Sequence, residues 1–296
     1  MPLCFDSPPS SPRTPTSTMS QGGAGGPSPS KRPRFGEEYS SPHRPPPKTP
    51  CQKVEERLNR PDSPLTRFSP VSGSFPEKIG KGAFAVVNGN PNEVCKQMFV
   101  APADNIAAAK KALGDTTNSP RPTRVSDAVD NLKAILDLMG VDGVVPVQGA
   151  DVVDSGNDQY AVLRIVMPRG EPFLKVLEQC NEADKKKWWD KYIATIRKVM
   201  AQLNGRFYTD IKPANAVVID GEVLLCDHGM GKKPELSIQY TTYEFTSREQ
   251  QLARGLWIQY QEVVLGRSLV LDEDKYLIWE EAKSTTDEDL VPFWPR

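Results

Sequence analysis

The chain has 296 residues and a formal net charge of −1, which gives no global electrostatic case for binding nucleic acid or a membrane surface. Its five cysteines form no metal-spaced pair and no disulfide framework, so we expect reduced thiols. No apolar run approaches the roughly 18 residues that a membrane span requires, and the N-terminus lacks the apolar stretch of a signal peptide. The sequence therefore predicts a soluble, intracellular protein without nucleic-acid or membrane partners.

Residues 1–74 are predicted to be a disordered tail. They are rich in Pro, Ser, Thr and Gly, and their large apolar residues are sparse and unpatterned. Little burial is then available to offset backbone ordering, which costs about 1–2 kcal/mol per residue. Residues 75–296 are predicted to form the folded domain.

The tail carries eight Ser-Pro or Thr-Pro dipeptides, which begin at Ser7, Ser11, Thr14, Ser28, Ser41, Thr49, Ser63 and Ser69. Two of them, at Ser28 and Ser41, have a basic residue three positions later and resemble sites of cyclin-dependent kinases. The alternative is that Ser and Pro are simply what disordered segments are made of, and both readings stay open. The run Lys31-Arg32-Pro33-Arg34 predicts a nuclear import signal, with a solvated basic linker as its alternative. We expect the nucleus, the cytoplasm or both as the location.

Residues 75–98 predict an antiparallel meander of strands. Apolar stretches at 75–79, 83–87 and 93–98 are separated by turn residues, among them Asn88 to Asn92. Small residues occupy the first turn at Gly80, Gly82 and Ala85. This turn resembles the glycine-rich loop of protein kinases, in which backbone N–H groups approach phosphate oxygens closely. Strand alternation then directs Val94 and Lys96 to the face beneath this turn.

Helices and one further strand are predicted in the next hundred residues. A short Ala-rich helix covers 103–113, and apolar residues at helical spacing predict a second helix from Ser126 to Gly140. An apolar strand at 160–167 ends at Pro168-Arg169-Gly170. Helical spacing resumes from Trp189 to Leu203, where the aromatic residues are expected in the core.

Residues 208–229 carry the polar groups that phosphoryl transfer needs. Asp210, Lys212, Asn215 and Asp227 lie within twenty residues of one another. Two apolar stretches joined by Asp220-Gly221 predict a hairpin, which returns Asn215 and Asp227 to the same end of a site. This pattern closely resembles the catalytic and metal-binding loops of protein kinases, His-Arg-Asp-Leu-Lys-Pro-x-x-Asn followed by Asp-Phe-Gly.

The resemblance implies an α+β, two-lobed protein-kinase-like fold. It places an antiparallel β-rich N-lobe at 75–167, a hinge at 168–170 and a shortened α-helical C-lobe at 171–296. The remaining helices of the C-lobe are expected at 250–265 and 272–283. Such a compact and divergent chain resembles viral or other outlying kinases more than housekeeping ones, and its subfamily is not identified.

The same resemblance implies an active Ser/Thr protein kinase that transfers the γ-phosphoryl of Mg-ATP to hydroxyls of protein substrates. Asp210 would receive the proton of the substrate hydroxyl, Lys212 would neutralise the transferring phosphoryl group, and Lys96 would contact the α- and β-phosphates. Asn215 and Asp227 would hold Mg²⁺. The residues expected to bind ATP are Ile79, Gly80, Lys81, Gly82, Ala83, Phe84, Ala85, Val86, Val87, Val94, Lys96, Met167, Arg169, Gly170 and Val217.

Three positions beside the catalytic residues depart from the family pattern. Tyr208 and Thr209 replace His-Arg, and His228 replaces the Phe of Asp-Phe-Gly. Without the arginine there is no obvious partner for a phosphate on the activation segment. We therefore predict activity that does not depend on phosphorylation of the segment around 241–243.

The helix from Ser126 also lacks the glutamate that pairs with the lysine in kinases. The position at which kinases carry this glutamate falls near Leu132. The nearby acidic residue Asp130 is therefore the candidate partner of Lys96. Two rival hypotheses remain beside the active kinase. One is a pseudokinase that serves as a scaffold, and the other is an interaction protein that works through its tail.

Overall fold

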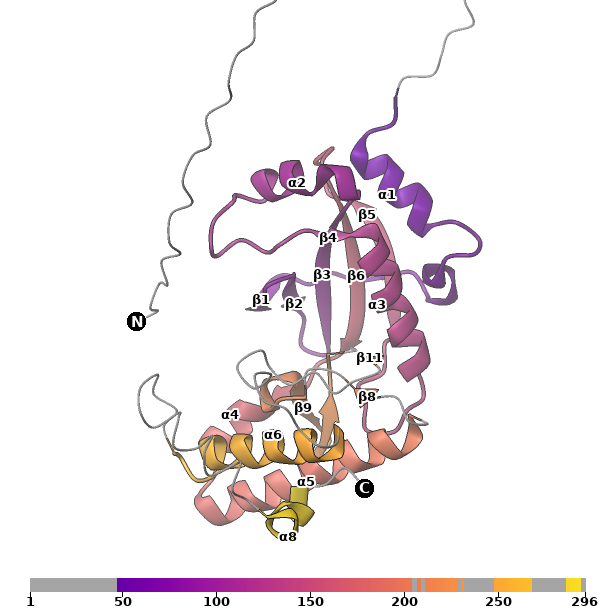
Figure 1. Cartoon of the computed structure of the whole chain (residues 1–296). Coiled ribbons are helices and arrows are strands. Elements are labelled where there is room, and N and C mark those ends of the chain that lie inside the picture. Colours follow the sequence, from indigo (N-terminus) through magenta and orange to yellow (C-terminus); the bar gives the residue numbers. More distant parts are fainter. Residues whose placement is uncertain are drawn as a thin grey trace, which may run out of the picture. The chain divides into compact units, whose positions relative to one another are not determined.

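The computed structural model describes residues 47–203, 207–208, 211–227, 230–231, 248–267 and 286–293. Within these ranges the chain is a mixture of strands and helices, so the predicted α+β class is confirmed (Figure 1). The tail up to residue 46, with its basic run, and the helix expected at 272–283 lie outside the described ranges. None of the described helices is both long and apolar enough to cross a membrane.

The largest sheet contains the predicted meander and the strand before Pro168. Its strand order is β1-β2-β3-β6-β5, each strand antiparallel to its neighbours, and the short β4 (Thr123–Arg124) pairs with β3 in parallel. The five main strands are β1 (Glu77–Lys81), β2 (Ala85–Gly89), β3 (Glu93–Ala101), β5 (Gly149–Asp154) and β6 (Ala161–Pro168). In this register Lys96 lies between Val87 on β2 and Ile165 on β6, which places it in the middle of the sheet.

Two helices between β3 and β5 match the predictions. A 3₁₀ turn (Ala103–Asn105) leads into α2 (Ile106–Ala112), and α3 extends over Val125–Leu138. The buried residues of α3 recur every three or four positions, as an amphipathic helix requires. They are Val125, Ala128, Leu132, Ile135 and Leu138.

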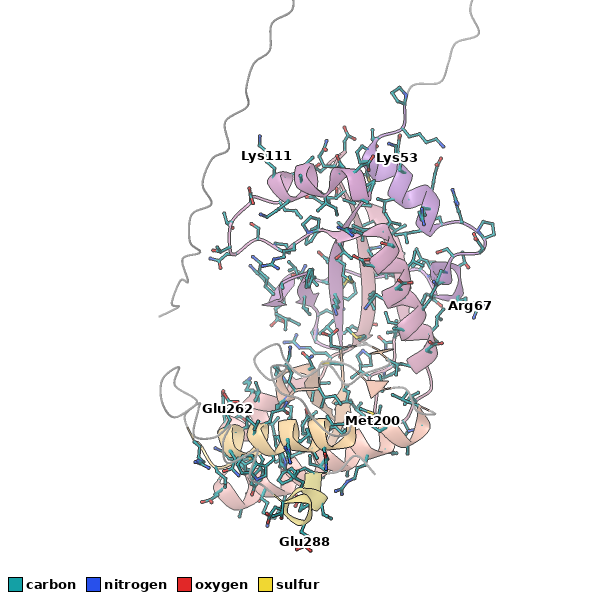
Figure 2. The ribbon with its side chains drawn as sticks, in the orientation of Figure 1. Lys53, Arg67, Lys111, Met200, Glu262 and Glu288 are labelled. Atoms are coloured by element: carbon teal, nitrogen blue, oxygen red, sulfur yellow. The ribbon has the colours of Figure 1, made fainter. Side chains whose placement is uncertain are left out.

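The expectation that residues 1–74 lack ordered structure is wrong for residues 47–74. Here α1 (Pro50–Leu58) and a 3₁₀ turn, η1 (Pro64–Arg67), pack into the hydrophobic cluster of the main sheet. Cys51, Val54 and Leu58 recur at helical spacing and give α1 one buried face. Lys53 of α1 and Arg67 of η1 are exposed (Figure 2). Composition averaged over a Pro-rich window conceals this short apolar stripe.

Two of the Ser-Pro or Thr-Pro sites start elements of this segment. The Thr49 hydroxyl accepts a hydrogen bond from the Gln52 N–H at 3.2 Å, and the Gln52 side chain accepts one from the Thr49 N–H at 3.0 Å. This capping box, with Pro50 in the first turn, begins α1. The hydroxyl of Ser63 accepts from the Leu65 N–H at 3.3 Å and begins η1 in the same way.

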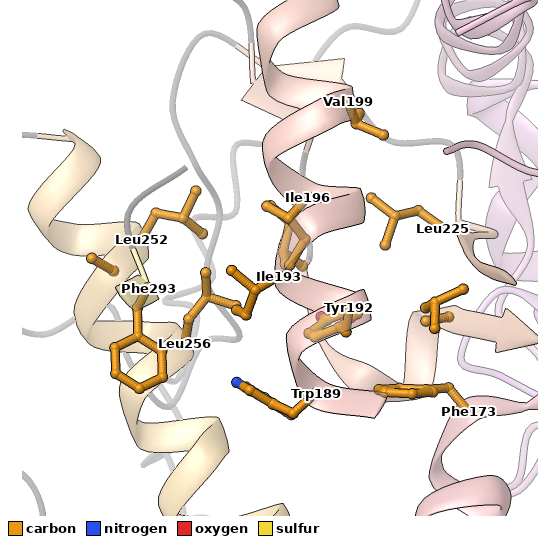
Figure 3. Packing of buried hydrophobic residues seen from close by; sticks show 14 of the residues in the cluster. Phe173, Trp189, Tyr192, Ile193, Ile196, Val199, Leu225, Leu252, Leu256 and Phe293 are labelled. Atoms are coloured by element: carbon orange, nitrogen blue, oxygen red, sulfur yellow. The ribbon is translucent and has the colours of Figure 1, made fainter. Parts of the chain in front are cut away.

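A second hydrophobic cluster surrounds α5 (Glu182–Gln202) (Figure 3). The helix predicted from Trp189 to Leu203 is confirmed, and so is the core position of its aromatic residues. Tyr192 stacks on Phe173 with ring centroids 5.2 Å apart. The other elements described here are α4 (Phe173–Gln179), α6 (Arg248–Val263), α8 (Asp287–Leu290) and a final 3₁₀ turn (Val291–Phe293).

The predicted hairpin is also present, and it joins the two clusters. Strands β9 (Ala216–Ile219) and β10 (Glu222–Leu225) pair antiparallel, and β7 (Glu171–Pro172) adds to the outer edge of β9. Asp220 and Gly221 have φ angles of 50° and 80°, as the predicted Asp-Gly turn requires. Beyond the hairpin, β8 (Phe207–Tyr208) pairs with β11 (Met230–Gly231).

Candidate active site

A cavity of about 540 Å³ opens between the main sheet and the hairpin. Its size lies within the range of about 300–1,000 Å³ that is usual for ligand pockets. The lining comes from β1 and the turn after it, from β2 and β3, from the end of β6 and from the segments that flank and include β9. The predicted site residues that line it are Ile79, Gly80, Lys81, Gly82, Ala85, Val87, Val94, Lys96, Met167, Gly170, Asn215, Val217 and Asp227.

The glycines of the first turn leave open space at the cavity. A Cβ added to Gly80 would meet no atom within 4 Å, and one added to Gly82 would meet only the Ala85 carbonyl oxygen, at 3.9 Å. The turn is held by the Gly82 N–H, which donates to that carbonyl at 2.9 Å. Packing within the protein therefore does not require glycine at either position, and the space beside the backbone is open.

Three residues in and after this turn that were predicted to bind ATP are not part of the cavity wall. Ala83, Phe84 and Val86 do not line the cavity, although their neighbours do. The side chain of Phe84 is directed to solvent, since the residue is 53% exposed. Strand alternation gives the reason for Val86, because Ala85 and Val87 occupy the cavity face of β2.

The hinge residue Arg169 is also turned away from the cavity. Its N–H donates to the Asn92 carbonyl at 2.8 Å, so this backbone group is already used. Its guanidinium donates to both carboxylate oxygens of Glu77, at 2.5 and 3.1 Å, and to the Asn90 carbonyl at 2.9 Å. The hydrogen bond from Arg169 lowers the pKa of Glu77. Arg169, which was predicted to contact ATP, is therefore not among the residues that line the cavity, and it ties the end of β6 to β1 and to the turn before β3.

Gly170 brings the hinge into close contact with β9. A Cβ added at this position would lie 2.8 Å from Val217 Cβ and 2.8 Å from Ile219 Cγ1. Real Cβ atoms do not approach other carbon atoms so closely, because packed interiors are already dense. Only glycine allows Val217 to line the cavity next to the hinge.

Lys96 and Asp227 form an ion pair inside the cavity. The Lys96 Nζ donates to Asp227 Oδ1 at 2.8 Å, although the two residues are 131 positions apart in the chain. Their side chains are 21% and 42% exposed. The pair thus combines a fixed geometry with access to solvent.

Asp130, the predicted partner of Lys96, is elsewhere, and this prediction is wrong. Its carboxylate accepts from Lys133 at 3.2 Å, and its side chain is 73% exposed. The buried face of α3 carries Ala128 and Leu132 instead. Because successive helical residues are about 100° apart, Asp130 points away from the face that carries its neighbours at 128 and 132.

The hairpin brings Asn215 and Asp227 to the same cavity, as predicted. The Cys226 N–H donates to the Asn215 carbonyl at 3.0 Å and connects the two ends of the hairpin. An amide oxygen and a carboxylate are hard donors that suit Mg²⁺, which commonly keeps one or two protein ligands and takes the rest from water and phosphate. No group of three or more His, Cys, Asp or Glu residues in the described ranges could hold a metal without such help.

The other predicted catalytic residues precede the hairpin. Lys212 is half-buried and is not among the residues that line the cavity, and the Asn215 N–H donates to its carbonyl at 2.9 Å. Asp210, Thr209 and His228 lie outside the described residues, as do the positions 241–243.

Six residues that line the cavity were not predicted from the sequence: Val145, Pro168, Pro172, Ala214, Ala216 and Cys226. Three of them could have been found from the sequence because they adjoin predicted site residues. Cys226 precedes Asp227, and Ala214 and Ala216 flank Asn215. Burial raises the pKa of the Cys226 thiol to about 11; the Asp227 carboxylate adds to this shift and Lys96 opposes it. The thiol is therefore protonated at neutral pH and belongs to the wall of the cavity.

Two buried hydrogen bonds connect α5 and α6 to the hairpin and to the segment that precedes it. The Gln259 side chain on α6 donates to the Ile211 carbonyl at 2.9 Å, directly after position 210. The Thr195 hydroxyl on α5 donates to the Val223 carbonyl of β10, also at 2.9 Å. Because such bonds fix backbone position in a low-dielectric core, α5 and α6 hold the segment that carries the polar site residues.

Comparison with known proteins adds no relative to this picture. A scan against protein-family models finds no match. A search of curated proteins finds no similar sequence either. The chemistry of the cavity is thus supported by its own geometry and by the sequence resemblance of its loops.

Proposed function

We propose that the chain is a Ser/Thr protein kinase, with the two-lobed fold implied by its loops, which transfers the γ-phosphoryl of Mg-ATP to protein hydroxyls. The observation that carries this proposal is the Lys96–Asp227 ion pair in a cavity lined by a glycine-rich turn. Lys96 and Asp227 are 131 positions apart in the chain but meet in the cavity. In the proposed complex, the phosphates of ATP and their Mg²⁺ would bind at this place.

The energetics of the pair favour a functional role over a structural one. A partly exposed ion pair contributes only about 0–1 kcal/mol to stability, because solvent screens it and both side chains lose freedom. Holding two opposite charges in a mostly apolar cavity is thus poorly explained by folding. A ligand that offers an anion to Lys96 and a cation to Asp227 would replace the pair without leaving either charge unpaired.

The remaining lining suits the parts of a nucleotide. Val87, Val94 and Val217 give apolar surface for a flat base. Asn215 and Asp227 would hold Mg²⁺, which when bound offsets the charge of phosphate oxygens. Lys96 would keep the α- and β-phosphates in place, so that binding fixes the γ-phosphoryl group relative to the protein.

Transfer itself would need little covalent chemistry from the protein. Asp210 would orient the substrate hydroxyl and receive its proton, and Lys212 would stabilise the charge on the transferring group. A lysine two positions after the aspartate resembles Ser/Thr kinases, whereas tyrosine kinases usually lack it. This supports serine and threonine as acceptors.

The test is an ATP γ-phosphoryl transfer assay on the purified full-length chain beside Asp210→Asn and Lys96→Ala. We expect transfer to serine or threonine of a generic protein substrate, and losses of at least about 100-fold in both variants. Equal transfer by all three proteins would reveal a contaminating kinase. No transfer by any of them, with ATP still bound, would overturn the proposal in favour of a pseudokinase.

Activity is further predicted to be independent of activation-segment phosphorylation. Replacing Thr241 and Thr242 with Ala and Tyr243 with Phe in one variant should leave transfer within about twofold of the wild type, because position 209 is Thr and offers no cation to a phosphate there. A loss of about tenfold or more would contradict this part of the proposal.

A further inference from the structure

Residues 47–71, called here the N-terminal brace, comprise α1, η1 and the extended segment that follows them. We propose that this brace holds α3 in position against the main sheet, so that the catalytic domain carries its own positioning element for that helix. The packing claim stands alone, and its consequence for catalysis rests on the proposed function.

Apolar packing is the first support. Cys51, Val54 and Leu58 of α1 and Leu65 of η1 are all buried in one hydrophobic cluster. The same cluster contains four of the five buried residues of α3, namely Val125, Ala128, Leu132 and Ile135. Val54 and Leu58 are fully buried, at 0% exposure. The helix α1 contacts α3 and the strands β3, β5 and β6, and η1 also contacts α3. The brace therefore covers α3 and the sheet at once.

Polar anchors fix the brace at its two ends. The Cys51 N–H at the start of α1 donates to the Asp158 carbonyl in the β5–β6 turn, at 3.1 Å. At the other end, the Ala150 N–H of β5 donates to the Ser69 carbonyl at 3.0 Å, and the Val71 N–H donates to an Asp151 carboxylate oxygen at 3.2 Å. A Cβ on Gly149 would lie 2.8 Å from the Ser69 carbonyl oxygen, so glycine is required for this close approach.

The inner side of α3 offers no charge that could tie it to the cavity. Lys96 is paired with Asp227 instead, and Asp130 faces solvent beside Lys133. The residues that α3 directs into the cluster are apolar. Apolar packing has no fixed direction, so a helix held by it alone can slide. Further elements that pack against α3 in the same cluster restrict that movement.

The position of α3 matters for the cavity because it backs the strand that carries Lys96. Leu132 and Ile135 belong to the same cluster as Met98 of β3 and Ile165 of β6, the residue paired with Lys96. A shift of α3 would uncover this side of β3. Through β3, the brace is thus coupled to the lysine without touching it.

The test is hydrogen–deuterium exchange of the full-length chain, followed by peptide mass spectrometry without nucleotide. The variants are Val54→Asp, which places a charge in the buried face of α1, and the milder Val54→Ala. The matched control is Lys53→Asp, which places the same carboxylate one residue earlier on the exposed side (Figure 2).

We expect Val54→Asp to raise exchange in α3, residues 125–138, by about tenfold or more, while α5, residues 182–202, keeps its protection. Val54→Ala should show the same pattern with smaller amplitude, and Lys53→Asp should match the wild type. If Val54→Asp unfolds the whole chain, Val54→Ala decides. Exchange that rises in α1 while α3 stays at the wild-type level would overturn the proposal.

Transfer activity separates this inference from the proposed function. Val54→Ala should lower the transfer rate at saturating ATP more than Lys53→Asp does. A wild-type chain without transfer would refute the kinase proposal, yet the exchange experiment would still decide whether the brace holds α3.

Discussion

At the scale of residues, the Lys96–Asp227 pair determines what the cavity can accept. An anion alone would satisfy Lys96 but would leave the Asp227 carboxylate without its cation and close to a second negative charge. A cation alone would have the opposite effect on Lys96. A ligand that displaces this pair preserves the charge balance of the site when it brings both signs, as the proposed phosphate with a bound divalent metal would.

Two glycines of the cavity are predicted to respond differently to the same substitution. Gly170→Ala should lower the free energy of unfolding by about 1–3 kcal/mol, because its Cβ would overlap Val217 and Ile219. Gly80→Ala should leave stability nearly unchanged, because its Cβ meets nothing, but it should weaken ATP binding by filling the open space. Urea denaturation and calorimetric titration measure the two effects. Equal stability of both variants would contradict this account of Gly170.

The sequence predicted three polar residues of the cavity and most of its walls, whereas Lys212 does not line the cavity and Asp210 lies outside the described residues. Lys96, Asn215 and Asp227 were identifiable because their types and spacing match the chemistry, and all three line the cavity. Arg169 was misplaced because adjacency to the hinge does not reveal that Glu77 and Asn90 capture its side chain. Gln259 was missed because a buried glutamine has no sequence pattern that separates it from an exposed one.

At the scale of elements, the hairpin that carries Asn215 and Asp227 is held by α5. The bond from Thr195 to the Val223 carbonyl is buried and joins the two. Thr195→Val keeps the shape of the side chain but removes the donor, so we predict a loss of about 1–3 kcal/mol in the free energy of unfolding.

Thr195→Ser separates the hydroxyl from the methyl group of the same residue. It retains the donor and should keep the backbone N–H groups of β10 as protected in hydrogen exchange as in the wild type. Thr195→Val should raise their exchange, because the hairpin loses an anchor and opens more readily. Urea denaturation of the three proteins gives the stability values. A Thr195→Val variant as stable as the wild type would show that the bond does not anchor the hairpin.

Elements with strong periodicity were predictable from the sequence, and those defined by distant contacts were not. The spacing of buried residues predicted α3 and α5, and Asp220-Gly221 predicted the hairpin. In α1, Cys51, Val54 and Leu58 carried a helical signal, but their Pro-rich surroundings outweighed it. Strand β5 was also missed, since its stability comes from pairing with β6 and from the brace along its edge.

At the scale of the whole described chain, two hydrophobic clusters meet at one cavity. One supplies Lys96 from a central strand, and the other supplies the support for the hairpin that carries Asp227. The α+β class was predictable from the order of strands and helices. The meeting of the clusters was predicted only through the resemblance to protein kinases, because local sequence patterns alone do not reveal contacts over more than a hundred residues.

The central claim is that the cavity binds ATP together with Mg²⁺ through Lys96 and Asp227. Calorimetric titration with ATP, with and without Mg²⁺, on the wild type and Asp227→Asn tests it directly. We predict that Mg²⁺ tightens ATP binding to the wild type by about tenfold or more, or about 1.4 kcal/mol. Its effect on Asp227→Asn should be clearly smaller, because the uncharged amide binds Mg²⁺ more weakly than a carboxylate and does not repel the phosphates. An equal effect of Mg²⁺ on both proteins, or no binding of ATP to the wild type, would contradict the claim.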